Sequence, residues 1–185
     1  FENGMLLSKD GKTMYMALLT LTEINVSNGV VSILGDSLIG SNATKIILPD
    51  TVSSNFGGAV FNGMNKLTTI ELSGTSKNLK LVDGNLYSYD GKRFIKYMGS
   101  SKNFTVPEGV ETVVSYCITK SMTTLNLPST LKVIEGWSLT GMSGVKLLNI
   151  PASVTTMYTY SFHDNTKLRV AEGSATYKSS DDVLI

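Results

Sequence analysis

Histidine and cysteine, the residues that most often serve as bases, nucleophiles and metal ligands, occur once each in this chain, as His163 and Cys117. A lone cysteine cannot form an intramolecular disulfide or complete a cysteine-based zinc or redox motif. His163 is followed by Asp164, but neighbours on a turn rarely face one another, so we interpret His163 as a turn residue exposed to water. These residues predict no catalytic site and no enzyme.

The remaining polar motifs do not predict a metal or cofactor site either. Asp181 and Asp182 lack the alternating oxygen-ligand spacing of calcium-binding loops. The glycines of the segment GGAVFNG (57–63) lack the lysine and the strand–loop–helix context of a phosphate loop. We therefore expect no metal and no cofactor.

Composition excludes further classes of function. Sixteen Lys and Arg against fifteen Asp and Glu give a net charge of +1. The chain therefore lacks the strongly positive surface that attracts nucleic acid, and we expect no nucleic-acid partner. No run approaches the roughly 18 apolar residues that cross a bilayer, so we expect no membrane insertion in this segment. The N-terminus also lacks the basic-then-apolar layout of a signal peptide. If the native protein is exported, its signal has been removed here.

An internal repeat is the strongest signal in the chain. Six segments share the same pattern of residues. Each has two apolar residues separated by one position and then a residue that we call the marker. In most segments another apolar residue follows three positions after the marker. The markers are Ser27, Pro49, Ser73, Pro107, Pro128 and Pro151. A repeat of this length indicates a solenoid, because one coil cannot bury its own apolar faces but stacked coils bury them against each other. Proline is tolerated because it ends a short strand.

Each coil also carries a large apolar residue ten to twelve positions after the marker. We expect these residues to plug the core: Ile39, Phe61, Ile118, Leu139 and Phe162. Small residues precede most of them, and Cys117 in that column is interpreted as a packed, inert thiol. The predicted fold is a β-rich α/β solenoid of about six coils of 21–24 residues, with irregular or short helical turns.

The longest step between markers contains residues 77–103, which we interpret as a β-hairpin insert turning at Asp90-Gly91. Residues 83–94 match residues 3–14 at an offset of 80, and residues 177–185 resemble the start of a third copy. The aromatic residues of this region, Tyr87, Tyr89, Phe94 and Tyr97, are expected to pack within the hairpin and against the solenoid. We treat residues 1–185 as one solenoid and expect it to be a fragment of a longer array.

The pattern L-x-x-I-x-L-P-x-x-V-x-x-I-x-x-x-x-F resembles the BspA-like leucine-rich repeats of bacterial cell-surface proteins. The residues that carry it are Ile47, Pro49, Val52, Leu67, Ile70, Leu72, Leu125, Leu127, Pro128, Leu131, Ile134, Ile150, Pro151, Val154 and Phe162. The resemblance implies a leucine-rich-repeat fold in a secreted or cell-surface protein, with adhesion as its usual role.

Three aromatic residues stand two positions before the expected plugs of the last three coils: Tyr116, Trp137 and Tyr160. Equivalent positions of neighbouring coils lie about 4.7–4.9 Å apart where coils pair as strands. The first two coils carry Ser37 and Ala59 there, so we predict an aromatic ladder limited to the C-terminal half. It could bind a sugar or a protein partner, or it could only cap the hydrophobic edge.

The sequence therefore predicts a non-catalytic module, secreted or displayed on the cell surface, that binds a host or matrix protein or a glycan through Tyr116, Trp137 and Tyr160. The alternative is a structural stalk or spacer, which would have no ligand of its own.

Overall fold

The computed structural model describes residues 3–55, 58–164, 166–179 and 183–184. Contacts between residues group into two compact units. Unit 1 comprises residues 1–90 and 95–99, and unit 2 comprises residues 91–94 and 100–185.

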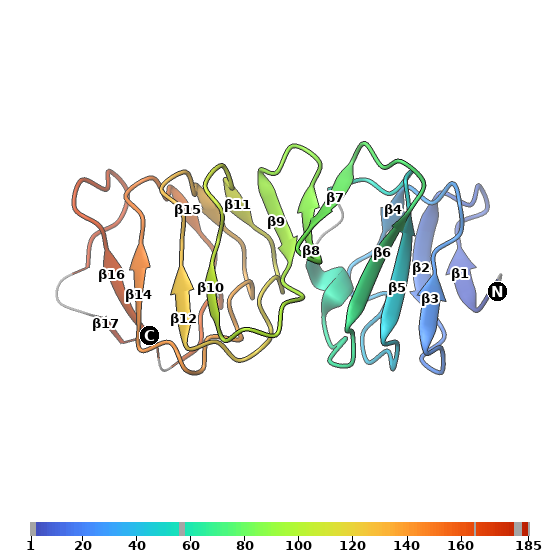
Figure 1. Ribbon diagram of the computed structural model, residues 1–185, viewed down its shortest axis with the longest axis horizontal. Helices are drawn as coiled ribbons and strands as arrows, with labels where there is room; N and C mark the ends of the chain where they lie inside the picture. The colour runs from blue at the N-terminus through green and yellow to red at the C-terminus, as the bar shows by residue number, and fades with distance from the viewer. Residues whose placement is uncertain (1–2, 56–57, 165, 180–182, 185) are drawn as a thin grey trace. The chain divides into compact units, whose positions relative to one another are not determined.

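Unit 1 is built from short strands and one short helical turn (Figure 1). Its elements are β1 (Met5–Leu7), β2 (Thr13–Ala17), β3 (Glu23–Asn25), β4 (Ser32–Ile33), β5 (Lys45–Pro49), the 3-10 helix η1 (Gly58–Phe61), β6 (Thr69–Ser73), β7 (Leu79–Val82) and β8 (Asn85–Ser88). One sheet has the order β1-β2-β4 and a second the order β3-β5-β6. Successive coils therefore contribute strands alternately to two faces.

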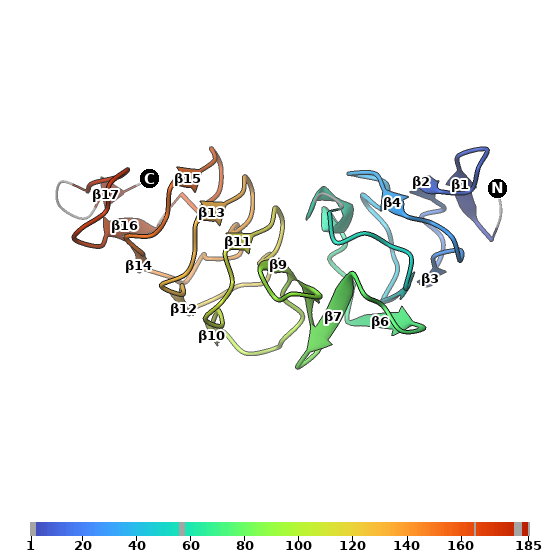
Figure 2. The same ribbon diagram turned by 90° about the horizontal axis from the view of Figure 1, so that it is seen from above.

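Unit 2 repeats this arrangement. Its strands are β10 (Asn103–Thr105), β11 (Thr112–Val113), β12 (Thr124–Asn126), β13 (Val133–Ile134), β14 (Leu147–Ile150), β15 (Thr156–Met157), β16 (Lys167–Val170) and β17 (Val183–Leu184), and it includes the first two residues of β9 (Arg93–Lys96). Strands β11, β13 and β15 run along one side, and β10, β12 and β14 along the other (Figure 2). Pairing from coil to coil is parallel, as in a solenoid.

Five of the six marker residues begin a tight turn. In five coils the backbone N–H three positions later donates to the carbonyl of the marker residue, at 3.1–3.3 Å. The donors are Val30, Val52, Val110, Leu131 and Val154, and all five side chains are buried. Proline fits the marker position because this turn uses only its carbonyl, so the missing N–H costs nothing there.

The plug column is confirmed in three coils and wrong by one residue in the first, and in the last coil Phe162 is only half-buried. Phe61, Ile118 and Leu139 are buried, with at most 1% of each exposed. In the first coil Leu38 is fully buried, whereas Ile39 is 50% exposed. Two apolar residues stand side by side there, and only one of them can point inward.

The α/β part of the predicted fold class is wrong. The described residues contain no α-helix, and η1 is their only helical element. They form a β-solenoid of about seven turns. The physical reason is that the segments between strands are rich in Gly, Ser, Thr and Asn, which favour turns over helix.

Residues 77–103 contain an antiparallel hairpin formed by β7 and β8 around Asp83 and Gly84. The predicted turn at Asp90-Gly91 lies between β8 and β9, which are neighbours in the same sheet. The predicted insert is not separate from the solenoid, however, because Arg93 and Phe94 of β9 pair in parallel with Thr112 and Val113 of β11. Arg93 and Phe94 therefore belong to the stacked strands of unit 2. Of its aromatic residues, Tyr87, Phe94 and Tyr97 are buried and Tyr89 is exposed.

The copy at an offset of 80 residues has the same backbone geometry. Asn3 and Gly4 have φ of 49° and 77°, and Asp83 and Gly84 have 49° and 75°. Ser8 donates to Asp10 at 2.6 Å, and Ser88 donates to Asp90 at 2.6 Å. Positive φ at two successive positions is the requirement of a type I′ hairpin turn, which Asn-Gly and Asp-Gly satisfy.

Candidate functional site: an aromatic ladder on unit 2

Tyr116, Trp137 and Tyr160 occupy equivalent places in three consecutive coils of unit 2. Each has positive φ, at 54°, 62° and 59°. The Cys117 N–H donates to the Val114 carbonyl at 3.1 Å, so Tyr116 is the third residue of a β-turn.

Backbone hydrogen bonds between coils hold the three residues in line. The Tyr116 N–H donates to the Trp137 carbonyl at 3.1 Å, and the Trp137 N–H donates to the Tyr160 carbonyl at 3.0 Å. The rings follow the backbone. The ring centroids of Tyr116 and Trp137 are 6.3 Å apart with planes 2° from parallel, and those of Trp137 and Tyr160 are 4.9 Å apart at 12°.

The first coil of the chain places Asp36 at this position. Asp36 has φ of 62°, and its N–H donates to the Ala59 carbonyl at 3.3 Å. Asp36 is therefore the equivalent of the ladder residues, and the assignment of Ser37 from the sequence was wrong by the same one-residue shift as the plug. Ala59 was assigned correctly, and neither residue is aromatic.

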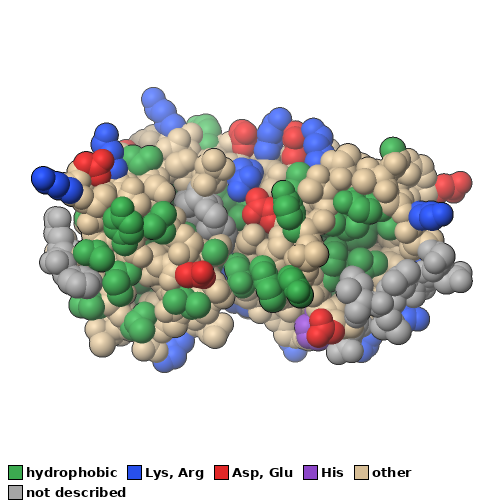
Figure 3. Space-filling view, turned by 180° about the vertical axis from the view of Figure 1, so that it is seen from behind, with side chains coloured by type: hydrophobic (Ala, Val, Ile, Leu, Met, Phe, Trp, Pro, Cys, Tyr) green, Lys and Arg blue, Asp and Glu red, His purple; other side chains and the backbone are tan. Residues whose placement is uncertain are grey.

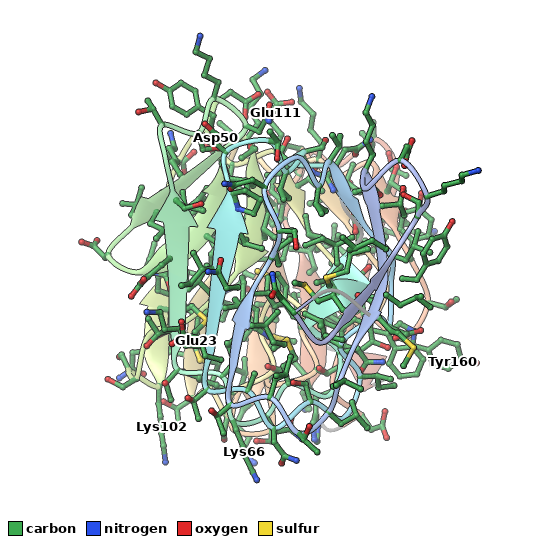
Figure 4. The ribbon with its side chains drawn as sticks, turned by 90° about the vertical axis from the view of Figure 1, so that its right-hand side faces the viewer. Glu23, Asp50, Lys66, Lys102, Glu111 and Tyr160 are labelled. Carbon is green, nitrogen blue, oxygen red and sulfur yellow. The ribbon has the colours of Figure 1, made fainter. Side chains whose placement is uncertain are left out.

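The ladder rings lie on the surface. Trp137 is 46% exposed and Tyr160 69% exposed, while Tyr116 is half-buried. Figure 3 shows hydrophobic side chains gathered on the face that carries β11, β13 and β15, and Figure 4 shows Tyr160 pointing outward from the ribbon. The rings are therefore not part of the buried core.

Energetics give the ladder only a small part in stability. Positive φ favours glycine or asparagine, and a larger residue there costs roughly 1–2 kcal/mol. Each stacked aromatic pair contributes about 0.5–1.5 kcal/mol beyond the area it buries. The two stacked pairs therefore do not outweigh the strain of the three residues at positive φ. The folding of unit 2 does not explain why aromatic residues occupy these turns.

Glu135 supports the turns beneath the ladder. Its carboxylate accepts hydrogen bonds from the Ser115 N–H at 3.0 Å and the Ser115 hydroxyl at 3.1 Å. Arg93 contacts the other oxygen of that carboxylate at 3.3 Å. Glu135 lies two residues before Trp137, and Ser115 lies directly before Tyr116. One carboxylate thus ties the two turns together.

An open cleft of about 670 Å³ adjoins Tyr160, the last residue of the aromatic ladder. Its lining consists of Trp137, Thr140, Tyr158, Thr159, Tyr160, Ser161, Phe162, His163 and Asp164. Sequence reasoning identified Trp137 and Tyr160 but gave no binding role to the rest of this lining. His163 was expected to be exposed to water; it is half-buried and lines the same cleft as Asp164. The shared position of His163 and Asp164 in the cleft depends on how their loop folds, so the sequence alone does not show it.

Among the described residues, the other candidates do not gather into a second site. The thiol of Cys117 lies in the core, as expected for a packed cysteine. Asp181 and Asp182 lie outside the described residues. Within the described ranges there is no group of three or more His, Cys, Asp or Glu side chains that could hold a metal ion. None of the helices found in those ranges is long and apolar enough to span a bilayer.

Three solved structures of bacterial proteins have a similar fold. A leucine-rich repeat protein of Eubacterium ventriosum is 20% identical with a TM-score of 0.66 over 80% of this chain. The pneumococcal vaccine antigen PcpA is 19% identical with a TM-score of 0.62 over 80%. A leucine-rich cell surface protein of Faecalibacterium prausnitzii is 19% identical with a TM-score of 0.51 over 100%. The chain spans 42%, 44% and 57% of these structures.

Identities this low show the fold alone. No curated protein matches the chain. The sequence matches six copies of the BspA type leucine-rich repeat region, over residues 11–89 and 91–181. That match covers nearly the whole chain and agrees with the coil-to-coil pairing of its strands. The chain belongs to the BspA type leucine-rich repeat family.

Proposed function

We propose that this chain is a non-catalytic recognition module that works outside the cell and binds an extracellular protein or glycan through Tyr116, Trp137 and Tyr160. The observation that carries the proposal is the exposure of the stacked rings. Exposed aromatic residues that contribute little to stability match the composition of binding hot spots, which are rich in Trp and Tyr. The repeat fold supplies a rigid support, since backbone hydrogen bonds join each ladder residue to the next.

The extracellular setting is supported by the similar structures. One of them is described as a leucine-rich cell surface protein and another as a vaccine antigen. Those descriptions belong to proteins about 20% identical to this chain. We therefore take them as support for the setting and not for any particular partner.

The direct test is binding of the chain to arrays of extracellular matrix proteins and glycans, compared with the variant Trp137→Asn. Asparagine tolerates positive φ better than alanine does, so the turn is preserved while the ring is removed. Tyr89→Asn is the matched control, because Tyr89 is 57% exposed in a turn of unit 1, away from the ladder residues in sequence. We expect a saturable ligand that Trp137→Asn loses and Tyr89→Asn keeps.

Two results would oppose the proposal. A ligand that both variants bind equally well would place the binding surface elsewhere. A chain that binds nothing on the arrays would favour the alternative of a structural stalk or spacer, which needs no ligand.

A further inference from the structure

The two faces of the Tyr160 ring are in different surroundings. One face stacks on Trp137. Among the described residues no other ring stacks on Tyr160, and the side chain as a whole is 69% exposed. Trp137, in contrast, has a stacked neighbour on each side. A flat ligand that needs the face of an aromatic ring therefore finds it at Tyr160 and not at the middle of the ladder.

The cleft beside Tyr160 has the size and lining of a small-ligand site. Its volume of about 670 Å³ lies within the roughly 300–1,000 Å³ of typical ligand pockets. Polar groups stand around the aromatic surface: the hydroxyls of Thr140 and Thr159, the imidazole of His163 and the carboxylate of Asp164. No described residue donates a hydrogen bond to the Asp164 carboxylate in this structure, so its oxygens can accept from a ligand.

The charge of the lining selects the class of ligand. Neither Lys nor Arg is among the lining residues, and Asp164 contributes a negative charge. Phosphorylated and carboxylated ligands would meet repulsion without a compensating cation. A neutral pyranose fits both features, because its C–H face packs on an aromatic ring while its hydroxyls donate to a carboxylate and exchange hydrogen bonds with threonine hydroxyls.

We propose that the cleft formed by Tyr160, Thr140, His163 and Asp164 binds a neutral pyranose unit of a glycan, with the sugar stacked on the outer face of Tyr160. This inference rests on the proposed recognition function and specifies its ligand class. Two ladder residues then have different roles. Tyr160 contacts the sugar, and Trp137 holds the Tyr160 ring in place by stacking on its other face.

Trp137 is the single tryptophan of the chain, and it reports on this site directly. A sugar bound against Tyr160 alters the surroundings of the stacked indole, so its fluorescence changes with saccharide concentration. The probes are lactose, maltose, cellobiose and diacetylchitobiose, titrated to millimolar concentrations. Glucose 6-phosphate is the charged comparison. We expect a saturable change with at least one neutral disaccharide and none with the phosphorylated sugar.

Variants then locate the sugar. Tyr160→Asn should weaken binding by roughly tenfold or more, as expected for loss of a hot-spot ring. Asp164→Asn tests the hydrogen-bonding contribution without removing the ring, and it should weaken binding while leaving circular dichroism and thermal unfolding unchanged. Tyr89→Asn should bind like the parent chain, because Tyr89 is not among the residues that line the cleft.

The outcomes separate this inference from the broader function. Absence of a response to every neutral disaccharide, or a response that persists in both Tyr160→Asn and Asp164→Asn, overturns the pyranose site. If a matrix protein still binds the chain and Trp137→Asn loses it, the recognition function stands without the sugar. If neither saccharides nor proteins bind, both proposals fail.

Discussion

The Trp137 N–H donates to the Tyr160 carbonyl at 3.0 Å, and the rings of the same two residues stack with centroids 4.9 Å apart. The backbone bond and the ring contact join the same pair of coils. Because the solenoid fixes the spacing of its coils, it also fixes the spacing of the rings. The ladder is therefore rigid without needing to be buried.

Removing the middle ring should leave the fold intact. We expect Trp137→Asn to change the free energy of unfolding by no more than about 1 kcal/mol, since relief of backbone strain offsets the lost stacking. Trp137→Ala keeps more of the strain and should be the less stable of the two variants. Chemical denaturation of both proteins measures the difference. A loss of about 3–5 kcal/mol, typical of a buried tryptophan, would mean that the ring belongs to the core.

Close packing between coils should make Gly141 irreplaceable. A Cβ atom at Gly141 would lie 2.1 Å from the Lys120 carbonyl oxygen, whereas at Gly136 it would lie 3.2 Å from the Thr159 carbonyl oxygen. Neither glycine has positive φ, so the comparison isolates the collision with backbone. We expect Gly141→Ala to destabilise unit 2 by about 2–3 kcal/mol and Gly136→Ala by clearly less. Equal thermal unfolding midpoints would contradict the coil spacing described here.

The buried hydroxyl of Ser138 should be dispensable for stability, whereas the hydroxyl of Ser161 should not. Ser138 and Ser161 occupy the same column, but the Ser138 hydroxyl has no hydrogen-bond partner among the described residues, whereas that of Ser161 donates to the Glu135 carbonyl at 3.0 Å. Burying an unpartnered hydroxyl costs roughly 1–3 kcal/mol. Ser138→Ala should therefore raise the thermal unfolding midpoint and Ser161→Ala should lower it. The idea fails if both substitutions act in the same direction.

Acid should weaken unit 2 partly through Glu111. Hydrogen bonds from Lys92 and then from Lys132 lower the pKa of the Glu111 carboxyl below its ordinary value of 4.5. A carboxyl with a lowered pKa in the folded state stabilises the fold above its unfolded pKa, and that contribution is lost as pH falls below about 4.5.

The measurement is the unfolding midpoint of the parent chain and of Glu111→Gln between neutral pH and pH about 3. The variant should lose less stability on acidification, and added salt should narrow the gap between the two proteins by screening the exposed pairs. Identical pH profiles would show that these ion pairs add nothing measurable.

The repeat itself was predictable because its turns depend on local chemistry. A proline or serine marker followed three residues later by an apolar residue specifies a turn whose hydrogen bond recurs in five coils. Residues in one column of a solenoid share one environment, so the sequence also placed Tyr116, Trp137 and Tyr160 in a single row. Their stacking follows from the periodicity of the chain.

What the sequence could not specify depends on backbone conformation and on loop folding. Leu38 and Ile39 are equally apolar neighbours, and only the positive φ of Asp36 decides which of them points inward. Strand β9 could be recognised as part of the stack only through its pairing with β11. The cleft near Tyr160 combines residues from neighbouring coils with a turn containing His163, and no motif marks that combination.

The central claim is that the exposed ladder is a binding surface, and one paired measurement tests it most directly. Binding to the protein and glycan arrays and the free energy of unfolding are measured on the same preparations of the parent chain and Trp137→Asn. The account predicts that the variant loses its ligand while its stability changes by no more than about 1 kcal/mol. A variant that keeps full binding, or one that unfolds, would contradict it.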